Sequence, residues 1–153
     1  MYDQERKNWR IFCDKQSTKF NEFATNNIIW IFASSETEFL KKVEEHGRTL
    51  ENLTAIGAGG YVFDESKKDL LKLMQELHDE KAKFLKNFNN FCGAFLSELW
   101  NYEVEISLDT SDLDIINDLL DYNNITFEDL TNEQRLELLK VRKHYRKEFY
   151  KYN

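Results

Sequence analysis

Apolar side chains recur every three or four positions between residues 70 and 99, which is the spacing of one face of an α-helix. Only Lys81 interrupts this pattern. The pattern is about 30 residues long, more than an ordinary helix, and the segment 87–93 contains asparagines and a glycine, which are poor helix formers. We therefore predict helical residues 66–100 with a bend or break near 87–93, and we assign the stripe to the core. Its apolar members are Leu70, Met74, Leu77, Phe84, Phe88, Phe91, Phe95 and Leu99.

The same spacing predicts a helix at each end of the chain. Residues 1–26 form the first, and residues 131–153 form the last, which opens with a capping-box pattern at 131–134. Two shorter helices are expected at residues 35–46 and 112–122. The apolar face of the C-terminal helix comprises Leu138, Val141, Tyr145, Phe149 and Tyr152.

Two short β-prone runs, residues 53–57 and 61–63, flank a cluster of three glycines. Glycine adopts positive φ without steric cost, so such a cluster between strands favours a tight hairpin turn. We predict a β-hairpin in which Gly59 or Gly60 has a positive φ.

Two further runs predict strands. Residues 28–33 are apolar on both faces, which is typical of a central strand covered on both sides, and we expect Trp30 to be buried there. Residues 103–108 alternate polar and apolar positions, which predicts a half-exposed strand. The fold class is therefore expected to be α+β: a small, mostly antiparallel sheet of three or four strands with packed helices, in a single domain spanning residues 1–153.

Composition supports a folded protein of the cytoplasm. Apolar residues make up 41% of the 153 residues, enough for a core, and proline is absent. Cys13 and Cys92 lie far apart with no metal-binding spacing, which is typical of reduced thiols in a cytosolic protein. No apolar run reaches the length of a membrane helix and no secretory signal pattern opens the chain, so neither membrane insertion nor export is expected.

Charge is unevenly distributed towards the C-terminus. Residues 101–130 contain nine Asp and Glu but no Lys or Arg, whereas residues 131–153 contain seven Lys and Arg against three Glu. One interpretation of the basic helix is a surface for RNA or for an acidic protein. The simpler interpretation is a solvated helix face, partly neutralised by the neighbouring acidic segment. The basic residues concerned are Lys140, Arg142, Lys143, Arg146, Lys147 and Lys151.

The acidic segment also has two interpretations. Its spaced carboxylates resemble a phosphate backbone and would steer the protein towards the basic channel of a nucleic-acid enzyme. The simpler alternative is helix capping and solubility. The residues that define this acidic surface are Asp109, Asp112, Asp114, Asp118 and Asp121.

Patterns typical of catalysis, metal binding or cofactor binding are not found. The glycine cluster is followed by a strand and by no Lys-Ser/Thr pair, so it does not match a phosphate-binding loop. The three histidines are isolated, and residues 109–114 lack the glycine and the closing glutamate of an EF-hand. We therefore expect no cofactor, no metal and no enzymatic activity.

Three motifs together resemble a family of small uncharacterised proteins of phages and mobile elements. They are Ser34-Ser35-x-x-x-Phe39 after a strand, the segment Ile-Gly-Ala-Gly-Gly-Tyr-Val at 56–62, and Leu-Trp-Asn-Tyr-Glu at 99–103. The resemblance covers roughly residues 28 to 127, excludes the basic helix and carries no activity for individual residues. Chain size, split charge and a composition typical of AT-rich genomes also resemble phage anti-defence proteins, the nearest being inhibitors of type VI-B CRISPR effectors.

Two functions follow as hypotheses. The first is a non-catalytic inhibitor that binds and disables a bacterial RNA-guided nuclease, as the resemblance implies. The alternative is an RNA-binding accessory protein that acts through the basic C-terminal helix.

Overall fold

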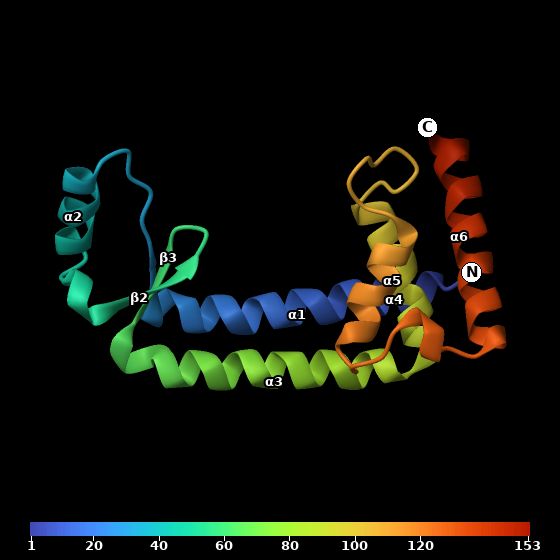
Figure 1. Ribbon diagram of the computed structural model, residues 1–153, viewed down its shortest axis with the longest axis horizontal. Coiled ribbons are helices and arrows are strands. Elements are labelled where there is room, and N and C mark those ends of the chain that lie inside the picture. Colours follow the sequence, from blue (N-terminus) through green and yellow to red (C-terminus); the bar gives the residue numbers. More distant parts are fainter. The chain divides into compact units, whose positions relative to one another are not determined.

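The computed structural model covers residues Met1 to Asn153 and divides into two compact units (Figure 1). Met1–Asp14 and His78–Asn153 form the helical unit, and Lys15–Leu77 form the sheet unit. The boundary falls within two long helices, α1 and α3. The elements in chain order are α1 (Asp3–Asn27), β1 (Ile28–Trp30), α2 (Glu36–Glu45), η1 (Leu50–Asn52), β2 (Leu53–Gly57), β3 (Gly60–Phe63), η2 (Asp64–Ser66), α3 (Lys67–Lys86), α4 (Phe88–Asn101), α5 (Asp112–Asp121), η3 (Phe127–Asp129) and α6 (Asn132–Tyr152), where η marks a short 3-10 helix.

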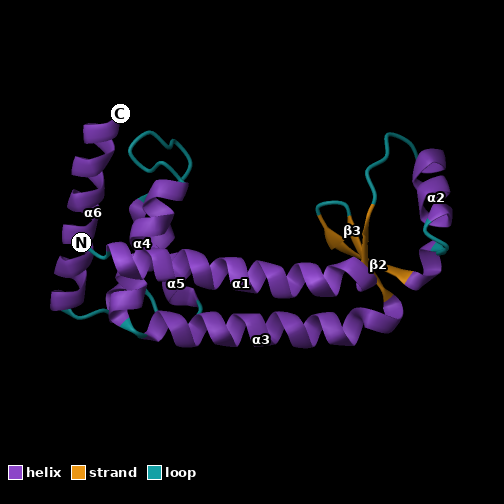
Figure 2. Ribbon diagram, turned by 180° about the vertical axis from the view of Figure 1, so that it is seen from behind, coloured by secondary structure: helices purple, strands orange, loops and turns teal.

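The fold class is α+β, as predicted, and all three strands belong to the sheet unit (orange in Figure 2). The strand order is β1-β3-β2 and both pairings are antiparallel. One face of the sheet packs against apolar side chains of α1 and α3, and the other packs against α2. The sheet is thus covered in part on both sides, which the apolar run at 28–33 indicated. The single-domain assignment stays a prediction, because the two units share α1 and α3.

Two expectations for the first strand were wrong. β3, not β1, is the central strand, and the Trp30 side chain is 46% exposed rather than buried. Trp30 pairs across the sheet with Gly60, which has no side chain, and a Cβ at Gly60 would lie 2.6 Å from the Trp30 ring. The indole therefore rests on the glycine backbone at the sheet edge, and half of its surface stays in solvent.

The glycine cluster forms the predicted hairpin turn. Gly57, Ala58 and Gly59 all have positive φ, at 94°, 51° and 81°. Position 59 requires glycine for a second reason, because a Cβ there would lie 2.6 Å from the ring of Phe32. The expectation of a positive φ at Gly59 or Gly60 is confirmed for Gly59.

The core of the helical unit surrounds α4. Phe91 to Ser97 are all buried, and they pack against α5 and α6. The predicted break in the long helical stretch is confirmed: α3 ends at Lys86, and the Asn87 side chain caps α4 by accepting a hydrogen bond from the Asn90 N–H at 3.1 Å. Gly93 marks a close approach, because a Cβ there would lie 2.4 Å from the backbone of Glu5. Phe95 is fully buried, as expected.

The strand predicted at residues 103–108 is wrong. These residues form turns after α4, and Glu103 has a φ of 46°. The Val104 N–H bonds the carbonyl of Leu99, which closes the end of α4. Of the apolar positions in the alternating pattern, only Val104 is buried, whereas Ile106 is 62% and Leu108 is 99% exposed. No neighbouring strand pairs with this segment. The sheet accordingly has three strands, the lower of the two numbers expected.

None of the helices combines the length and apolar character that a membrane span requires.

Candidate interaction surfaces

Helix α5 presents the acidic surface. Ser111 caps it, because its hydroxyl accepts a hydrogen bond from the Asp114 N–H at 3.2 Å while the Asp114 carboxylate accepts one from the Ser111 N–H at 3.1 Å. This capping box lowers the pKa of the Asp114 carboxyl. The buried face of α5 points to α4 and leaves Asp118 and Asp121 exposed on the opposite side. That buried face consists of Ile115, Ile116, Leu119 and Leu120.

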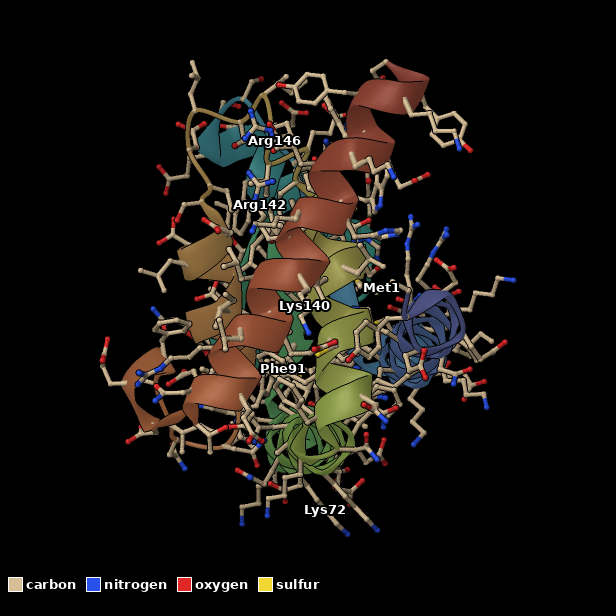
Figure 3. The ribbon with its side chains drawn as sticks, turned by 90° about the vertical axis from the view of Figure 1, so that its right-hand side faces the viewer. Met1, Lys72, Phe91, Lys140, Arg142 and Arg146 are labelled. Carbon is tan, nitrogen blue, oxygen red and sulfur yellow. The ribbon has the colours of Figure 1, made fainter.

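Two other acidic residues of segment 101–130, Glu105 and Asp112, form ion pairs with arginines of α6. Arg142 of α6 bonds the Glu105 carboxylate at 2.5 Å and lies 3.7 Å from the Asp112 carboxylate. Arg146 lies 3.8 Å from the other oxygen of Glu105. Figure 3 shows the two arginines one turn apart on the side of α6 that faces the loop after α4. The internal neutralisation expected between the acidic segment and the basic helix is found for these two arginines, and no lysine of the helix takes part in it.

Glu105 is the buried partner of this cluster, since its side chain is only 8% exposed. Burial alone would raise the pKa of its carboxyl, but the hydrogen bond from Arg142 and the charges of Arg142 and Arg146 outweigh it and lower the pKa. The Glu105 N–H also bonds the hydroxyl of the fully buried Tyr145 at 3.4 Å. Glu105 thus ties the turn after α4 to α6.

The basic helix accordingly contains two kinds of cation. Arg142 and Arg146 are structural, as described above, and Lys140 lies 3.6 Å from Glu137 one turn away. Lys143, Lys147 and Lys151 are exposed and make no ion pair. They follow each other at four-residue spacing, so they lie along one side of α6. We refer to these three as the free lysines.

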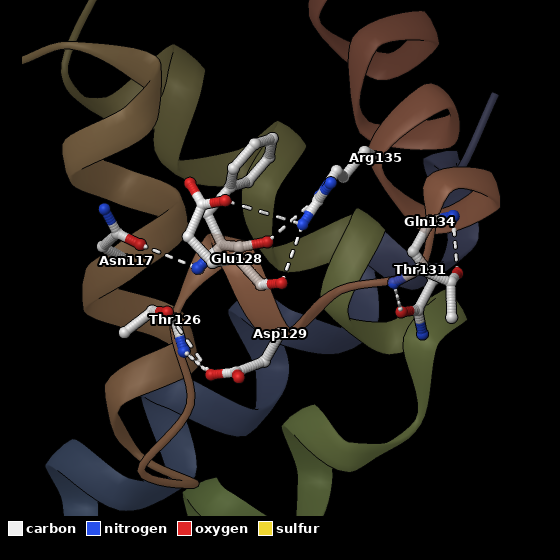
Figure 4. A network of polar contacts seen from close by, with 8 residues as sticks. Asn117, Thr126, Glu128, Asp129, Thr131, Gln134 and Arg135 are labelled. Carbon is white, nitrogen blue, oxygen red and sulfur yellow. Dashed lines mark hydrogen bonds and ion pairs between the residues drawn. The ribbon is translucent and has the colours of Figure 1, made fainter.

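Three further charged residues, Glu128, Asp129 and Arg135, form polar contacts at the connection between α5 and α6 (Figure 4). Arg135 donates to the backbone carbonyls of Phe127 and Glu128, at 3.3 and 2.7 Å, and its guanidinium lies 3.7 Å from the Glu128 carboxylate. The Asp129 carboxylate accepts the Thr126 N–H at 2.8 Å. The predicted capping box at the start of α6 is present, with Thr131 and Gln134 bonded to each other's N–H.

Among the five predicted acidic residues, Asp118 and Asp121 form no hydrogen bond or ion pair through their carboxylates, and we call them the free carboxylates. Asp109 is also exposed, but it lies in the preceding loop, where its N–H bonds the Ser107 hydroxyl at 3.3 Å. Sequence reasoning grouped all five residues; the structure places Asp112 in an ion pair, Asp114 in a cap and the free carboxylates beside a cavity.

That cavity was not predicted. Its volume is about 580 Å³, and side chains of α1, α3, α4 and α5 form its walls. The free carboxylates, Glu98 and Lys81 supply its charges. A signal for it was present, because Lys81 was the one residue that broke the apolar stripe. Its aromatic walls are Trp9, Tyr102 and Tyr122.

The polar groups of the cavity are arranged around these rings. The Trp9 indole N–H donates to Oε1 of Glu98 at 3.0 Å. The Lys81 ammonium lies 5.7 Å from the Trp9 ring centre and 5.2 Å from that of Tyr122. Burial raises the pKa of the Cys13 thiol, which also lines the cavity, to about 11, so the thiol stays protonated at neutral pH. Cys13 is therefore not an activated nucleophile.

No group of three or more His, Cys, Asp or Glu side chains is placed to hold a metal ion.

Comparison with known proteins identifies one family. The model of a family of unknown function, DUF7659, matches residues 12–148. No curated protein and no solved structure matches the chain. The phage origin and the anti-CRISPR activity that the motif resemblance implied stay predictions.

Proposed function

We propose that this chain, which belongs to the DUF7659 family, is a non-catalytic inhibitor that binds a basic, nucleic-acid-handling protein through its acidic surface. The specific target that we propose is a bacterial RNA-guided nuclease of the CRISPR type VI-B class. Binding in the RNA channel of such an effector would block the guide or the target strand without any bond being broken.

The observation that carries this proposal is that the carboxylates of Asp118 and Asp121 form no ion pair, although lysines and arginines lie in the same unit. Asp114, Asp118 and Asp121 occupy the exposed side of α5 at intervals of about 6 and 4.5 Å along the helix axis. One strand of a duplex carries a phosphate about every 3.4 Å of axis, so the intervals between these carboxylates fall between one and two phosphate steps. A basic channel would attract such a row of charges.

A second candidate function, RNA binding through α6, is favoured by the free lysines. Tyr150 and Tyr152 are exposed beside them, and exposed tyrosines can stack on unpaired bases. Against it stands the formal net charge of −7, which repels a polyanion at distances beyond the helix itself. Three free cations are also few for a phosphate-binding surface. We therefore rank this function second.

The test is interference by a type VI-B effector in bacterial cells, with and without this chain, followed by a pull-down from the same cells. We expect the chain to restore survival of the targeted nucleic acid and to co-purify with the effector. Asp118→Asn/Asp121→Asn should lose both effects. The matched control is Glu44→Gln/Glu51→Gln, which removes the same charge from exposed positions of the sheet unit.

Failure to restore survival, together with no effector in the pull-down, would overturn the proposal. A complex with bare RNA whose affinity falls steeply with salt would then support the second function.

A further inference from the structure

We infer that the cavity between α1, α3, α4 and α5 in the helical unit binds an arginine side chain of the protein partner. This inference rests on the proposed function, because it supplies the anchor by which a basic partner is held. The cavity lies beside the free carboxylates, so one partner surface reaches both. Arginine is enriched among the residues that dominate binding energy at protein interfaces.

The walls of the cavity suit a flat cation. Trp9, Tyr102 and Tyr122 contribute rings, and Tyr102 is 52% exposed, so its ring remains accessible to an incoming side chain. A guanidinium stacks on aromatic faces and is more weakly hydrated than an ammonium. The volume of about 580 Å³ is ample for one arginine side chain and its neighbours.

The charge of the cavity also favours a cation. Three carboxylates, those of Glu98, Asp118 and Asp121, line the cavity together with one ammonium, that of Lys81. Among these four groups, two negative charges are left unbalanced. Both hydrogen bonds that Glu98 accepts, from Trp9 and Asn101, end on its Oε1 atom. Oε2 of Glu98 is therefore an acceptor without a protein donor. A guanidinium, with five N–H donors in one plane, can bond such an oxygen and an Asp carboxylate together.

Lys81 shows that the cavity already accommodates a positive charge. Its ammonium lies over two rings, at 5.7 and 5.2 Å, but within 4 Å of no carboxylate. An anionic ligand would gain Lys81 alone and would be repelled by three carboxylates. The balance of charges therefore favours a guanidinium from outside over a phosphate or a carboxylate.

The experiment titrates the full chain, labelled with ¹⁵N, with the blocked peptide acetyl-Gly-Arg-Gly-amide. The readout is the indole N–H resonance of Trp9, which donates to Glu98, and the indoles of Trp30 and Trp100 serve as internal references. The same peptide with citrulline, which keeps the shape of arginine without its charge, is the ligand control. We expect a saturable shift of the Trp9 resonance with the arginine peptide and none with the citrulline peptide.

Variants of the chain locate the site. Asp118→Asn/Asp121→Asn should weaken arginine-peptide binding about tenfold, since two charge-assisted contacts are lost. Glu44→Gln/Glu51→Gln removes the same charge from exposed positions that do not line the cavity, and binding should change less than twofold. Thermal unfolding monitored by circular dichroism verifies that both variants are folded.

Equal shifts with arginine and citrulline peptides, a shift that does not saturate, or equal weakening by both variant pairs would overturn the cavity assignment. The two proposals also fail separately. Arginine-peptide binding without nuclease inhibition contradicts the proposed function and leaves the cavity site standing. Nuclease inhibition without arginine-peptide binding contradicts the cavity site and leaves the proposed function standing.

Discussion

The acidic segment 101–130 and the basic helix α6 have opposite charge, yet the structure uses both in the same two ways. Some charges of each region pair with each other inside the molecule, where Arg142 and Arg146 neutralise Glu105. Part of each is left free on the surface: two carboxylates of α5 and three lysines of α6. Arginines make the internal contacts and lysines stay in solvent, which fits the planar guanidinium that can bond two carboxylates at once.

The two free sets differ in their surroundings, and that difference decides our ranking of functions. The free carboxylates line a cavity with three aromatic side chains, whereas the free lysines follow one exposed side of a helix. A cavity removes a bound side chain from water, and a few contacts made there can carry most of the binding energy. Free charge on a helix face attracts a partner but fixes no single geometry.

The largest expected effect comes from truncating a core side chain of α4, the helix against which both regions pack. Phe95 is fully buried in α4 between α5 and α6. Phe95→Ala should lower the free energy of unfolding by about 3–5 kcal/mol, as truncation of large core side chains does. Urea denaturation followed by far-UV circular dichroism measures it. A loss below roughly 1 kcal/mol would mean that α4 is not the shared support of the two surfaces.

Breaking the internal ion cluster should come next. Arg142→Met leaves the Glu105 carboxylate, whose side chain is 8% exposed, without its closest cation. We expect a loss of about 3 kcal/mol in unfolding free energy, at the lower end for a broken buried pair because Arg142 is partly exposed. Lys143→Met, one position along α6, is the matched control and should change stability by less than about 0.5 kcal/mol. Similar losses for the two variants would contradict the division into structural and free cations.

Acidification should weaken the same cluster. The folded-state pKa of Glu105 is lowered by Arg142, so its contribution is fully present above the unfolded-state pKa of about 4.3 and is lost as the pH falls through the lower folded-state value. The stability gap between the parent and Arg142→Met should therefore narrow below about pH 4. Urea midpoints at pH 7, 4 and 3 give the comparison. A gap that stays constant across this range would show that the carboxylate charge of Glu105 does not stabilise the fold.

The smallest stability effects belong to the free charges. Asp118→Asn/Asp121→Asn should alter the unfolding free energy by no more than about 0.5 kcal/mol, because neither carboxylate has a partner to lose. Lys143→Gln/Lys147→Gln/Lys151→Gln should be equally neutral. Differential scanning calorimetry tests both. A marked destabilisation by either set would place those charges in the fold rather than on a binding surface.

Local sequence rules predicted the helices, the break at Asn87 and the hairpin, because each depends on neighbouring residues. The capping pair Thr131 and Gln134 and the positive φ of Gly59 are such cases. The position of Trp30 was not predictable in this way. Its exposure depends on Gly60 lying opposite in the sheet, a register that only tertiary structure sets.

The candidate site was predictable only in part. The sequence separated acidic from basic residues, but it did not distinguish Asp112, which pairs with Arg142, from Asp118, which is free. That sorting depends on which side of α5 faces α6. The cavity escaped prediction because its lining comes from four helices, although Lys81, the polar exception in an apolar stripe, was visible from the start.

The central claim is that the free carboxylates, and not the free lysines, are the surface that meets the partner. The most direct measurement is the rate of association between this chain and the type VI-B effector, recorded by stopped-flow at increasing salt. For the parent, the rate should fall steeply with salt, as it does for electrostatically steered association. Asp118→Asn/Asp121→Asn should slow association and flatten that dependence, whereas the triple lysine variant should match the parent. The reverse pattern, with a flattened dependence only for the lysine variant, would contradict the account.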